Sequence, residues 1–342
     1  MIQPTNPLLS RVADSAYWMA RYIERAENVA RVAAVNFHLM LDLPSDLGNQ
    51  WQALVQTTGD AKVFRERHGE AMADNVIEFL AFDRDNPNSI ASCLFAAREN
   101  ARSIRDTISS EMWEQINGMY LQFTSPRPGG VELKSAVVRG AADLLSEYFR
   151  RVRMACHLFH GITDVTMSHN EPWHFLRLGR DLERADKTTR ILDVKYFILL
   201  PSVSEVGTPF DDIQWSALLK SVSGFEMYRK RFGRVSPDRV VEFMLMDGEF
   251  PRAVRYCVGE ADASLHSITG TRTGNFSCPS EQRLGLLRSE LDYTQTGAIL
   301  AGGLHEFLDG LQTRMNAIDG CILEDFFTLP LAAAATVRGG RS

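Results

Sequence analysis

The chain has 342 residues, of which 45% are hydrophobic and 23% charged, the balance of an ordinary globular protein with two domains or one large helical domain. Its formal net charge of −6 predicts no general affinity for nucleic acid or anionic lipid, and no run approaches the roughly 18 apolar residues of a transmembrane helix. Met1–Ser10 lacks a charged start followed by an apolar core, so we expect no signal peptide. Five cysteines without a Cys-x-x-Cys pair exclude a disulfide scaffold and a zinc ribbon. We therefore expect a cytoplasmic protein with reduced thiols and with no nucleic-acid or membrane partner.

Apolar residues recur at spacings of three and four along most of the chain, which predicts amphipathic helices. In chain order, the predicted helices are Tyr17–Leu41, Ala73–Phe82, Ser89–Ile108, Ser135–Phe159, Phe175–Leu199, Gln214–Tyr228, Arg252–Ile268 and Gln282–Ile318. The turn-rich segments between them are Leu43–Gly48, Asp83–Asn88, Ser125–Gly130, Pro201–Asp212, Asp247–Pro251 and Thr269–Pro279. Since no segment shows the sustained alternation of a β-strand, we predict an all-α helical bundle.

The chain also matches itself, in the same order, over about a hundred residues. Ala20–Glu27 matches Gly179–Asp186, and Gln50–Leu54 matches Gln214–Leu218 at a slightly larger offset. A longer linker around Pro201–Pro209 in the second copy accounts for the difference between the two offsets. This pattern predicts two tandem pseudo-symmetric repeats.

The matches divide the chain into four predicted parts. These are a first helical repeat at 1–130, a connecting long helix at 131–164, a second helical repeat at 165–325 and a flexible tail at 326–342. Copies of this kind usually pack about a pseudo-twofold axis, by analogy with a homodimer. We therefore expect the repeats to pack as one unit, with equivalent helices in contact.

Charged residues recur at the same spacing in the two best-matched helices. The chain has 31 arginines and 6 lysines, and although a GC-rich genome explains such a ratio, the arginine fork also grips carboxylates and phosphates. Three explanations stay open: a structural ion-pair network between the repeats, a binding site for a carboxylate, phosphate or peptide, and a solvated face. The candidate substrate-binding residues are Arg21, Arg25, Arg31, Arg180, Arg184 and Arg190.

Glu24 and Glu183 are the candidate catalytic residues if the protein is itself an enzyme. In the binding hypothesis they would orient the arginines or bind an amine. As an acid or base, each would have a pKa that is raised by burial or lowered by the arginines, and the sequence leaves both open.

Two segments carry a resemblance to a known family. ARYIERAENVAR at Ala20–Arg31 and FLRLGRDLERAD at Phe175–Asp186 resemble the signature of the alpha-E family, a bacterial all-helical family named for its Glu-Arg motif. The opening LSRVADSAYW at Leu9–Trp18 is similar to that family's start. The resemblance covers essentially the whole chain.

Members of that family tend to be encoded beside, or fused to, a circularly permuted ATP-grasp ligase, and often near a transglutaminase-like protein. The resemblance therefore implies an accessory or co-catalytic role in an ATP-dependent amide-forming or peptide-modifying system, with a peptide or amino-acid substrate. It implies no cofactor for this chain, because the partner ligase would bind ATP. The alternatives are a non-catalytic assembly protein and an enzyme that acts alone.

The remaining candidates for chemistry are weaker. His157, His160, His169 and His174 lie close together in the sequence, but their spacing fits no standard zinc site, so we expect no metal. Glu171 and His174 form the only Glu-x-x-His, whereas a di-iron bundle needs two. The start of this motif, with Pro172, is better explained as the beginning of a helix.

Three further features have structural explanations. The adjacent Gly302 and Gly303 lie in an apolar helical stretch, which indicates close helix packing. Cys93 and Cys257 occur at matching positions of the two copies on apolar helix faces, which predicts core thiols. The polar segment Thr269–Pro279 has no clear equivalent in the first copy, and we expect a surface loop, with a lid or docking element as the alternative.

Overall fold

The computed structural model describes residues 10–42, 50–124, 142–198 and 209–328, and this part of the chain contains helices and no strands. The α-helices are α1 (Ser10–Asp42), α2 (Gln50–Thr58), α3 (Ala61–His68), α4 (Ala73–Ile77), α5 (Ile90–Ser103), α6 (Ser110–Phe123), α8 (Ala142–Thr166), α9 (Glu171–Ile198), α10 (Pro209–Ser221), α11 (Phe225–Phe232), α12 (Pro237–Met246), α13 (Val254–Thr269), α14 (Pro279–Tyr293), α15 (Thr296–Gly302) and α16 (Leu304–Ile322). Two π-helical segments are η1 (Glu78–Phe82) and η4 (Leu323–Phe327). The all-α prediction is confirmed.

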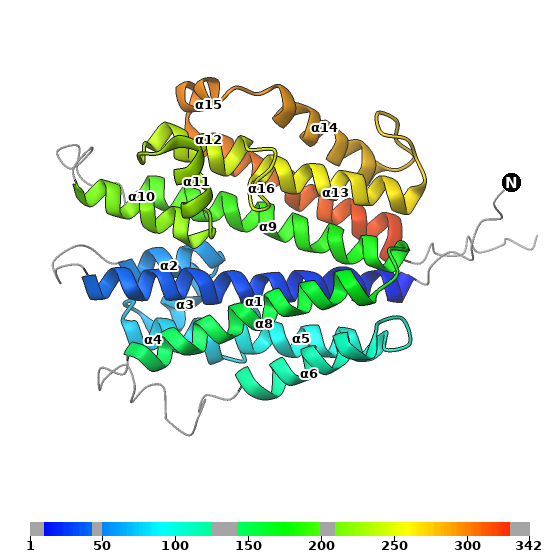
Figure 1. Ribbon diagram of the computed structural model, residues 1–342, viewed down its shortest axis with the longest axis horizontal. Helices are drawn as coiled ribbons and strands as arrows, with labels where there is room; N and C mark the ends of the chain where they lie inside the picture. Colours follow the sequence, from blue (N-terminus) through cyan, green and yellow to red (C-terminus); the bar gives the residue numbers. More distant parts are fainter. Residues whose placement is uncertain (1–9, 43–49, 125–141, 199–208, 329–342) are drawn as a thin grey trace, which may run out of the picture.

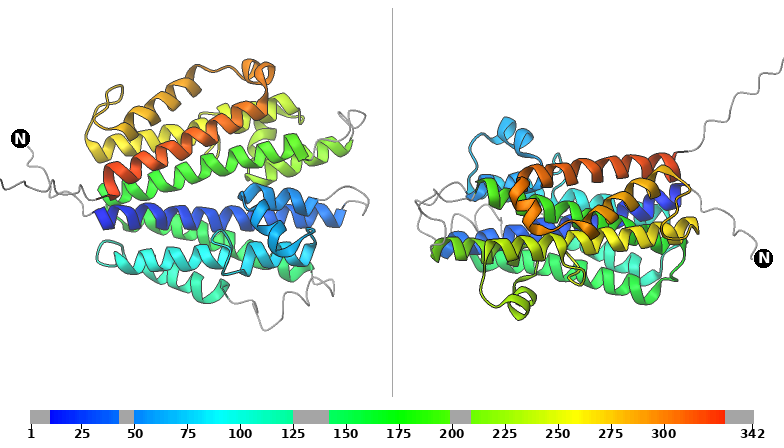
Figure 2. Two further views of the ribbon diagram at one scale, coloured as in Figure 1. Left: turned by 180° about the vertical axis from the view of Figure 1, so that it is seen from behind. Right: turned by 90° about the horizontal axis from the view of Figure 1, so that it is seen from above.

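The two Glu-Arg helices, α1 and α9, lie side by side through the middle of the molecule (Figures 1 and 2). On its other sides α1 packs against α5 and α8, whereas α9 packs against α13 and α16. Helices α5, α6 and α8 therefore lie on one side of the α1–α9 pair, and α13, α14 and α16 lie on the other (Figure 1).

Small residues bring α1 and α9 close together. Ala20, Ala26 and Ala30 of α1 are almost fully buried. On α9, a Cβ atom at Gly179 would collide with the backbone carbonyl oxygen of Tyr17. Since glycine is less favourable than alanine inside a helix, Gly179 is explained by this close approach of two backbones.

The structure corrects the helix predicted at Gln214–Tyr228, which is two helices. The chain turns between α10 and α11, where Ser223 has a φ of 54°. This left-handed conformation is incompatible with a continuous helix. The turn was hidden in the sequence because the apolar spacing continues across it.

The helix predicted at Gln282–Ile318 is three helices, α14, α15 and α16. Gly303 has a φ of 101°, so Gly302 ends α15 and Gly303 turns the chain into α16. The expectation that this glycine pair mediates helix packing is therefore wrong. Its function is to provide a backbone conformation that side-chain-bearing residues rarely adopt.

Further differences from the predictions include one helix and the ends of two predicted segments. Helix α6 was not predicted, although Ser109 caps it by accepting a hydrogen bond from the backbone nitrogen of Met112 (3.2 Å). The predicted connecting helix at 131–164 is described from Ala142 and continues to Thr166. Of the predicted tail at 326–342, Phe326 and Phe327 belong to η4, and residues 329–342 lie outside the described residues.

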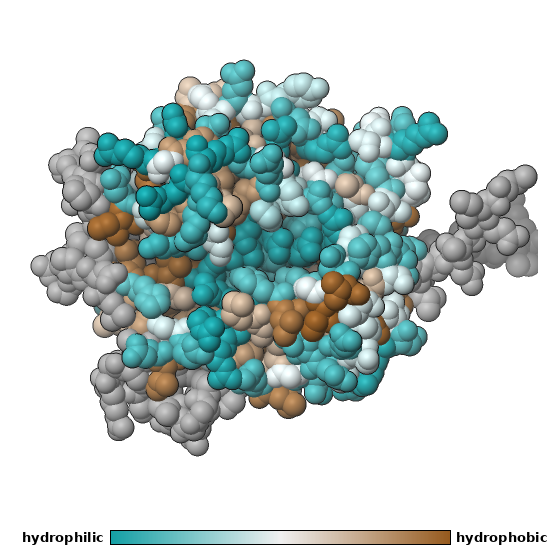
Figure 3. Space-filling view, in the orientation of Figure 1, coloured by the Kyte–Doolittle hydropathy of each residue, from teal (hydrophilic) through white to brown (hydrophobic). Residues whose placement is uncertain are grey.

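No helix in the described ranges is long and apolar enough to cross a membrane. One face of the molecule carries hydrophilic residues along its middle and a hydrophobic patch over α8 (Figure 3). Met154, Leu158 and Val165 are exposed on that helix.

Candidate functional site

The Glu-Arg pairs of the two central helices bind each other reciprocally. Arg25 of α1 donates from Nε and Nη2 to the two carboxylate oxygens of Glu183 of α9, at 2.7 and 2.9 Å. Arg184 of α9 in turn places Nη2 3.0 Å from Oε2 of Glu24 of α1. Both carboxylates are fully buried. Each helix thus supplies the anion for the other helix's arginine.

Further cations surround Glu183. Arg21 donates from Nε to Oε2 at 2.9 Å, and Lys187 places Nζ 3.6 Å from Oε1. Arg21 also donates to Asp319 of α16 and to the hydroxyl of Tyr17, which itself donates to Asp319 at 2.5 Å. This half of the network therefore ties α1 to both α9 and α16.

The other half is centred on Glu24 and Glu27. Arg252, in the turn before α13, bridges them by donating to Oε1 of Glu24 at 2.5 Å and to Oε2 of Glu27 at 2.9 Å. Arg31 also donates to Glu27 at 2.7 Å, and its Nε donates to the backbone oxygen of Ser221 at 2.8 Å. Arg31 has no exposed surface, so its charge is met by protein groups inside the structure.

The pKa values of Glu24 and Glu183 are set by the neighbouring cations rather than by burial. Burial alone would raise the pKa of Glu24, but Arg184 and Arg252 outweigh it and hold the pKa well below its usual range. Burial would likewise raise the pKa of Glu183. The positive charges of Arg25, Lys187 and Arg21 outweigh this effect and hold the pKa well below its usual range. Both side chains are therefore ionised at neutral pH, which suits an ion-pair partner better than a general acid.

The same balance applies around Glu27. Burial opposes ionisation, but Arg252 and Arg31 lower the pKa of Glu27 to about 2. Burial, together with repulsion from Arg252, lowers the pKa of Arg31 to about 10. His160 of α8 has its Nε2 3.4 Å from Oε2 of Glu24, and its burial lowers the pKa of the imidazole despite that carboxylate.

The geometry of the network can now be set beside known proteins. A family model, Alpha-E, described as a predicted alpha-helical domain with a conserved ER motif, matches residues 8–327. The chain belongs to the Alpha-E family. Its two ER motifs are Glu24-Arg25 and Glu183-Arg184, the residues that exchange the reciprocal ion pairs.

Curated relatives of this Alpha-E chain come from mycobacteria. Uncharacterized protein Mb2597 of Mycobacterium bovis and uncharacterized proteins MT2643 and Rv2567 of Mycobacterium tuberculosis are each 24% identical over 280 residues, which is 76% of this chain. The match covers only 30% of each relative's own length. No solved structure matches.

The structure brings together most of the predicted site residues of this Alpha-E chain. Two arginines stay at the edge of the network, each paired with a carboxylate of its own helix. Arg180 donates to Asp181 at 2.9 Å, and Arg190 donates to Asp186 at 2.8 Å, with about a quarter of each arginine side chain exposed.

Sequence reasoning missed Arg252 and Asp319, which complete the network. A signal for Arg252 was present, because the sequence match that aligns Pro251 with Pro87 also aligns Arg252 with Asn88. Asn88 also joins the network by accepting a hydrogen bond from Arg25 at 2.8 Å. Asp319 had no such signal, since it approaches Arg21 only through the packing of α16.

The histidines are dispersed rather than clustered. His157 and His160 face Glu27 and Glu24, whereas His169 stacks on Trp173 with ring centroids 3.9 Å apart. Within the described part of the chain, no group of three or more His, Cys, Asp or Glu side chains is placed to hold a metal ion.

Two cysteines behave as the sequence predicts. Cys93 and Cys257 are fully buried. Burial raises the pKa of the Cys93 thiol to about 12 and raises that of Cys257 as well. The assignment as core thiols is confirmed.

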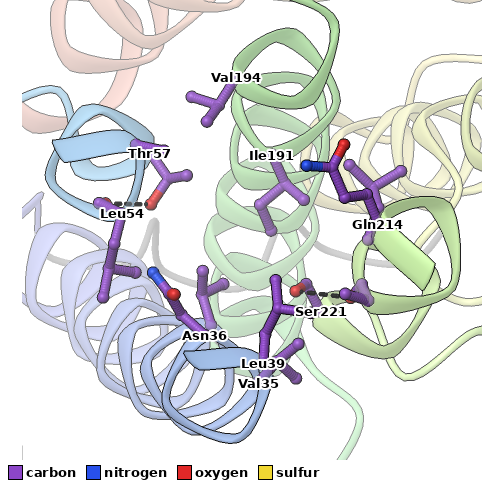
Figure 4. A pocket seen from close by; sticks show the side chains of 13 residues that line it. Val35, Asn36, Leu39, Leu54, Thr57, Ile191, Val194, Gln214 and Ser221 are labelled. Carbon is purple, nitrogen blue, oxygen red and sulfur yellow. Dashed lines mark hydrogen bonds between the residues drawn. The ribbon is translucent and has the colours of Figure 1, made fainter. Parts of the chain in front are cut away.

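A small cavity lies where α1, α9, α2 and α10 meet (Figure 4). Its volume is about 60 Å³, and its mostly apolar wall includes Leu54, Ile191 and Val194. A second cavity of about 20 Å³ shares Leu54 and Ile191 with it and extends to Arg25 and Lys187. Because one water needs about 10–15 Å³ on this scale, these spaces hold a few atoms and not a peptide.

Proposed function

We propose that this Alpha-E chain is a non-catalytic assembly component of an ATP-dependent amide-forming or peptide-modifying system, in which the ER motifs lock its two halves together. The observation that carries this proposal is the reciprocal pairing of Arg25 with Glu183 and of Arg184 with Glu24, across two helices, with both glutamates fully buried. The arginine forks are thereby occupied by the protein's own carboxylates.

The energetics favour the structural role over substrate binding. An external anion that took Arg25 from Glu183 would leave a buried carboxylate without its closest partner. Loss of one partner of a buried pair typically costs about 3–5 kcal/mol. A substrate anion would therefore bind only if its own interactions with the arginine were more favourable than this loss.

We further propose that the two halves are tandem copies related by a pseudo-twofold axis. Helices α3 and α11 are equal in length and begin at Ala61 and Phe225. Helices α5 and α13 begin at Ile90 and Val254, which are separated by the same distance along the sequence. A superposition of the two halves in an experimental structure tests this proposal, and unrelated helix directions would contradict it.

The proposed partner is a circularly permuted ATP-grasp protein, with a transglutaminase-like protein as a further member of the system. Support comes from family membership and from the relatives, whose matched region is only 30% of their length. In those proteins an ER-type segment therefore accompanies much additional sequence. ATP would be bound by the partner, and the Alpha-E chain would contribute its surface.

Co-expression with an ATP-grasp protein encoded next to this chain tests the proposal. We expect the two to elute together from a size-exclusion column, and we expect ATP consumption with pooled amino acids and peptides to depend on the Alpha-E chain. Separate elution together with unchanged ATP turnover would contradict the proposal. Turnover by the purified Alpha-E chain alone would contradict its non-catalytic part.

A second candidate is substrate binding through the ER helices themselves. It is favoured by the partial exposure of Arg180 and Arg190 at the edge of the network. Arg25→Lys distinguishes the two, because lysine keeps the charge but cannot reproduce the bidentate contact. Lost activity of the ligase system with unchanged unfolding supports binding, whereas lost stability supports the structural lock.

A further inference from the structure

A larger cavity lies away from the ER network and is lined by residues of α13, of α14 and of the connection 270–278. Its volume is about 340 Å³, within the range of about 300–1,000 Å³ that is typical of small-molecule sites. The corresponding connection between α5 and α6 is shorter, so this cavity is a feature of the second half.

A buried carboxylate lines this cavity and is only half satisfied. Asp262 of α13 is 1% exposed. Its Oδ2 accepts a hydrogen bond from Nη1 of Arg288 at 2.6 Å, but its Oδ1 has no hydrogen-bond partner. The nearest candidate, Nε2 of His266, is 3.6 Å away. A buried carboxylate oxygen without a hydrogen-bond donor costs free energy. A ligand that donates a hydrogen bond to Oδ1 would remove this cost.

The space beside that oxygen is kept open by a glycine. Gly285 of α14 also lines the cavity, and a Cβ atom at this position would lie 3.8 Å from Oδ1 of Asp262. Glycine is unfavourable inside a helix relative to alanine. At Gly285 no backbone approach requires it, since Asp262 Oδ1 is the only neighbour within 4 Å. Gly285 therefore leaves room for a ligand atom directly beside Oδ1 of Asp262.

One atom of the cavity wall lacks a hydrogen-bond donor. The charged residues that line the cavity are Asp262, Glu281 and Arg288, and Arg288 is paired with Asp262. Glu281 is satisfied by the backbone nitrogen and hydroxyl of Ser277, at 2.6 and 2.8 Å, and by Thr269. His266 lies between the two carboxylates, with Nδ1 3.2 Å from Oε1 of Glu281, and Oδ1 of Asp262 is where a hydrogen-bond donor is lacking.

We propose that this cavity binds a free α-amino acid, with its ammonium group donating to Oδ1 of Asp262. Arg288 pairs with Asp262 and Asp292, but 34% of its side chain is exposed, unlike the buried ER arginines, so it still presents a charge that matches the α-carboxylate. Phe276 and Leu286 are 58% and 65% exposed and supply apolar surface for the side chain. The proposal concerns the isolated chain, so its outcome is separate from that of the ligase partnership.

Isothermal titration calorimetry of the purified full-length chain tests this site. The probes are the common L-amino acids, each with its N-acetyl derivative, which keeps the carboxylate but removes the ammonium charge. We expect at least one amino acid to bind saturably at millimolar concentration or below, and its N-acetyl derivative to bind at least about tenfold more weakly, because a charge-assisted hydrogen bond is lost.

Two variants connect the binding to the cavity. Asp262→Asn removes the charge and should weaken binding about tenfold or more. Gly285→Leu should abolish binding by filling the space beside Asp262. The matched control is Gly118→Leu on α6, where no atom lies within 4 Å of the added Cβ, and it should bind normally. Circular dichroism confirms that each variant is folded.

Three results would overturn the proposal. These are no saturable binding of any amino acid to the wild-type chain, equal affinity for the N-acetyl derivatives, or unchanged binding by folded Gly285→Leu. If Asp262→Asn fails to fold, the glycine variants and the acetylated probes still decide the outcome.

Discussion

Arg25 and Glu183 form a two-point ion pair between α1 and α9, with nitrogen–oxygen distances of 2.7 and 2.9 Å. Glu183 has no exposed surface, and Arg25 has only 15% of its side chain exposed. The equivalent residues, Arg184 and Glu24, form the opposite pair. These two ion pairs join the two halves of the protein at their centre.

Glu183→Gln should destabilise the fold by about 3–5 kcal/mol, since it leaves Arg21 and Arg25 buried without their shared anion. Urea unfolding followed by circular dichroism measures this change. The control is Glu147→Gln, which breaks the exposed pair of Glu147 with Arg150 on α8 and should leave the midpoint unchanged. Equal midpoints for the two variants would contradict the network's structural role.

Stability should fall in acid because the network needs ionised glutamates. The pKa of Glu27 is lowered from the ordinary 4.5 to about 2, and the pKa values of Glu24 and Glu183 are also lowered. A lowered folded-state pKa stabilises the fold above the unfolded-state value and loses this effect as pH falls toward the folded-state value. Between pH 4.5 and pH 2 we therefore expect a loss on the order of a few kcal/mol.

The contribution of the network to this acid sensitivity is separable. Glu183→Gln cannot be protonated at that position, so its stability should decline less steeply over the same pH interval. Unfolding free energies at several pH values check the difference in slope. Identical slopes for the variant and the wild type would mean that other carboxylates cause the acid sensitivity.

Gly179→Ala should destabilise the protein by about 1–3 kcal/mol or more, since the new methyl group collides with the carbonyl oxygen of Tyr17 and separates α9 from α1. Gly161→Ala is the matched control, because Gly161 is exposed on α8 with no atom within 4 Å of the added Cβ. Helix propensity predicts that this control is stabilised by about 0.5–1 kcal/mol. Thermal unfolding measures both, and the two substitutions should shift the midpoint in opposite directions.

The thiols should be protected from alkylation in the native state. Cys93 and Cys257 are fully buried, and burial raises the pKa of both. Because the thiolate is the reactive form, iodoacetamide should label Cys93 and Cys257 only after unfolding, whereas the partly exposed Cys278 and Cys321 should react before them. Mass spectrometry of the native protein checks the order, and rapid native labelling of Cys93 would contradict its burial.

The sequence predicts the centre of the fold better than its periphery. Apolar spacing identifies α1 and α9, and the matching of Glu24-Arg25 with Glu183-Arg184 identifies the residues that meet. The turns that interrupt helices were harder to predict. Those at Ser223 and Gly303 depend on positive φ angles, which leave the apolar spacing of the sequence unchanged.

Partners of the ER residues that are distant in the sequence were harder still to predict. Asp319 reaches Arg21 from the far end of the sequence, and this proximity follows from the packing of α16 against α9. The direction of the glutamate pKa shifts was equally beyond the sequence. It depends on how many cations reach each carboxylate, and Arg252, which acts on Glu24 together with Arg184, lies outside both motifs.

The ER motifs stabilise the fold by pairing across α1 and α9. A double-mutant cycle on Arg25→Gln and Glu183→Gln, measured by urea unfolding, tests this role most directly because it isolates the interaction between the two side chains. We predict a favourable coupling of about 1–3 kcal/mol. Two single variants with wild-type stability and a coupling near zero would contradict it.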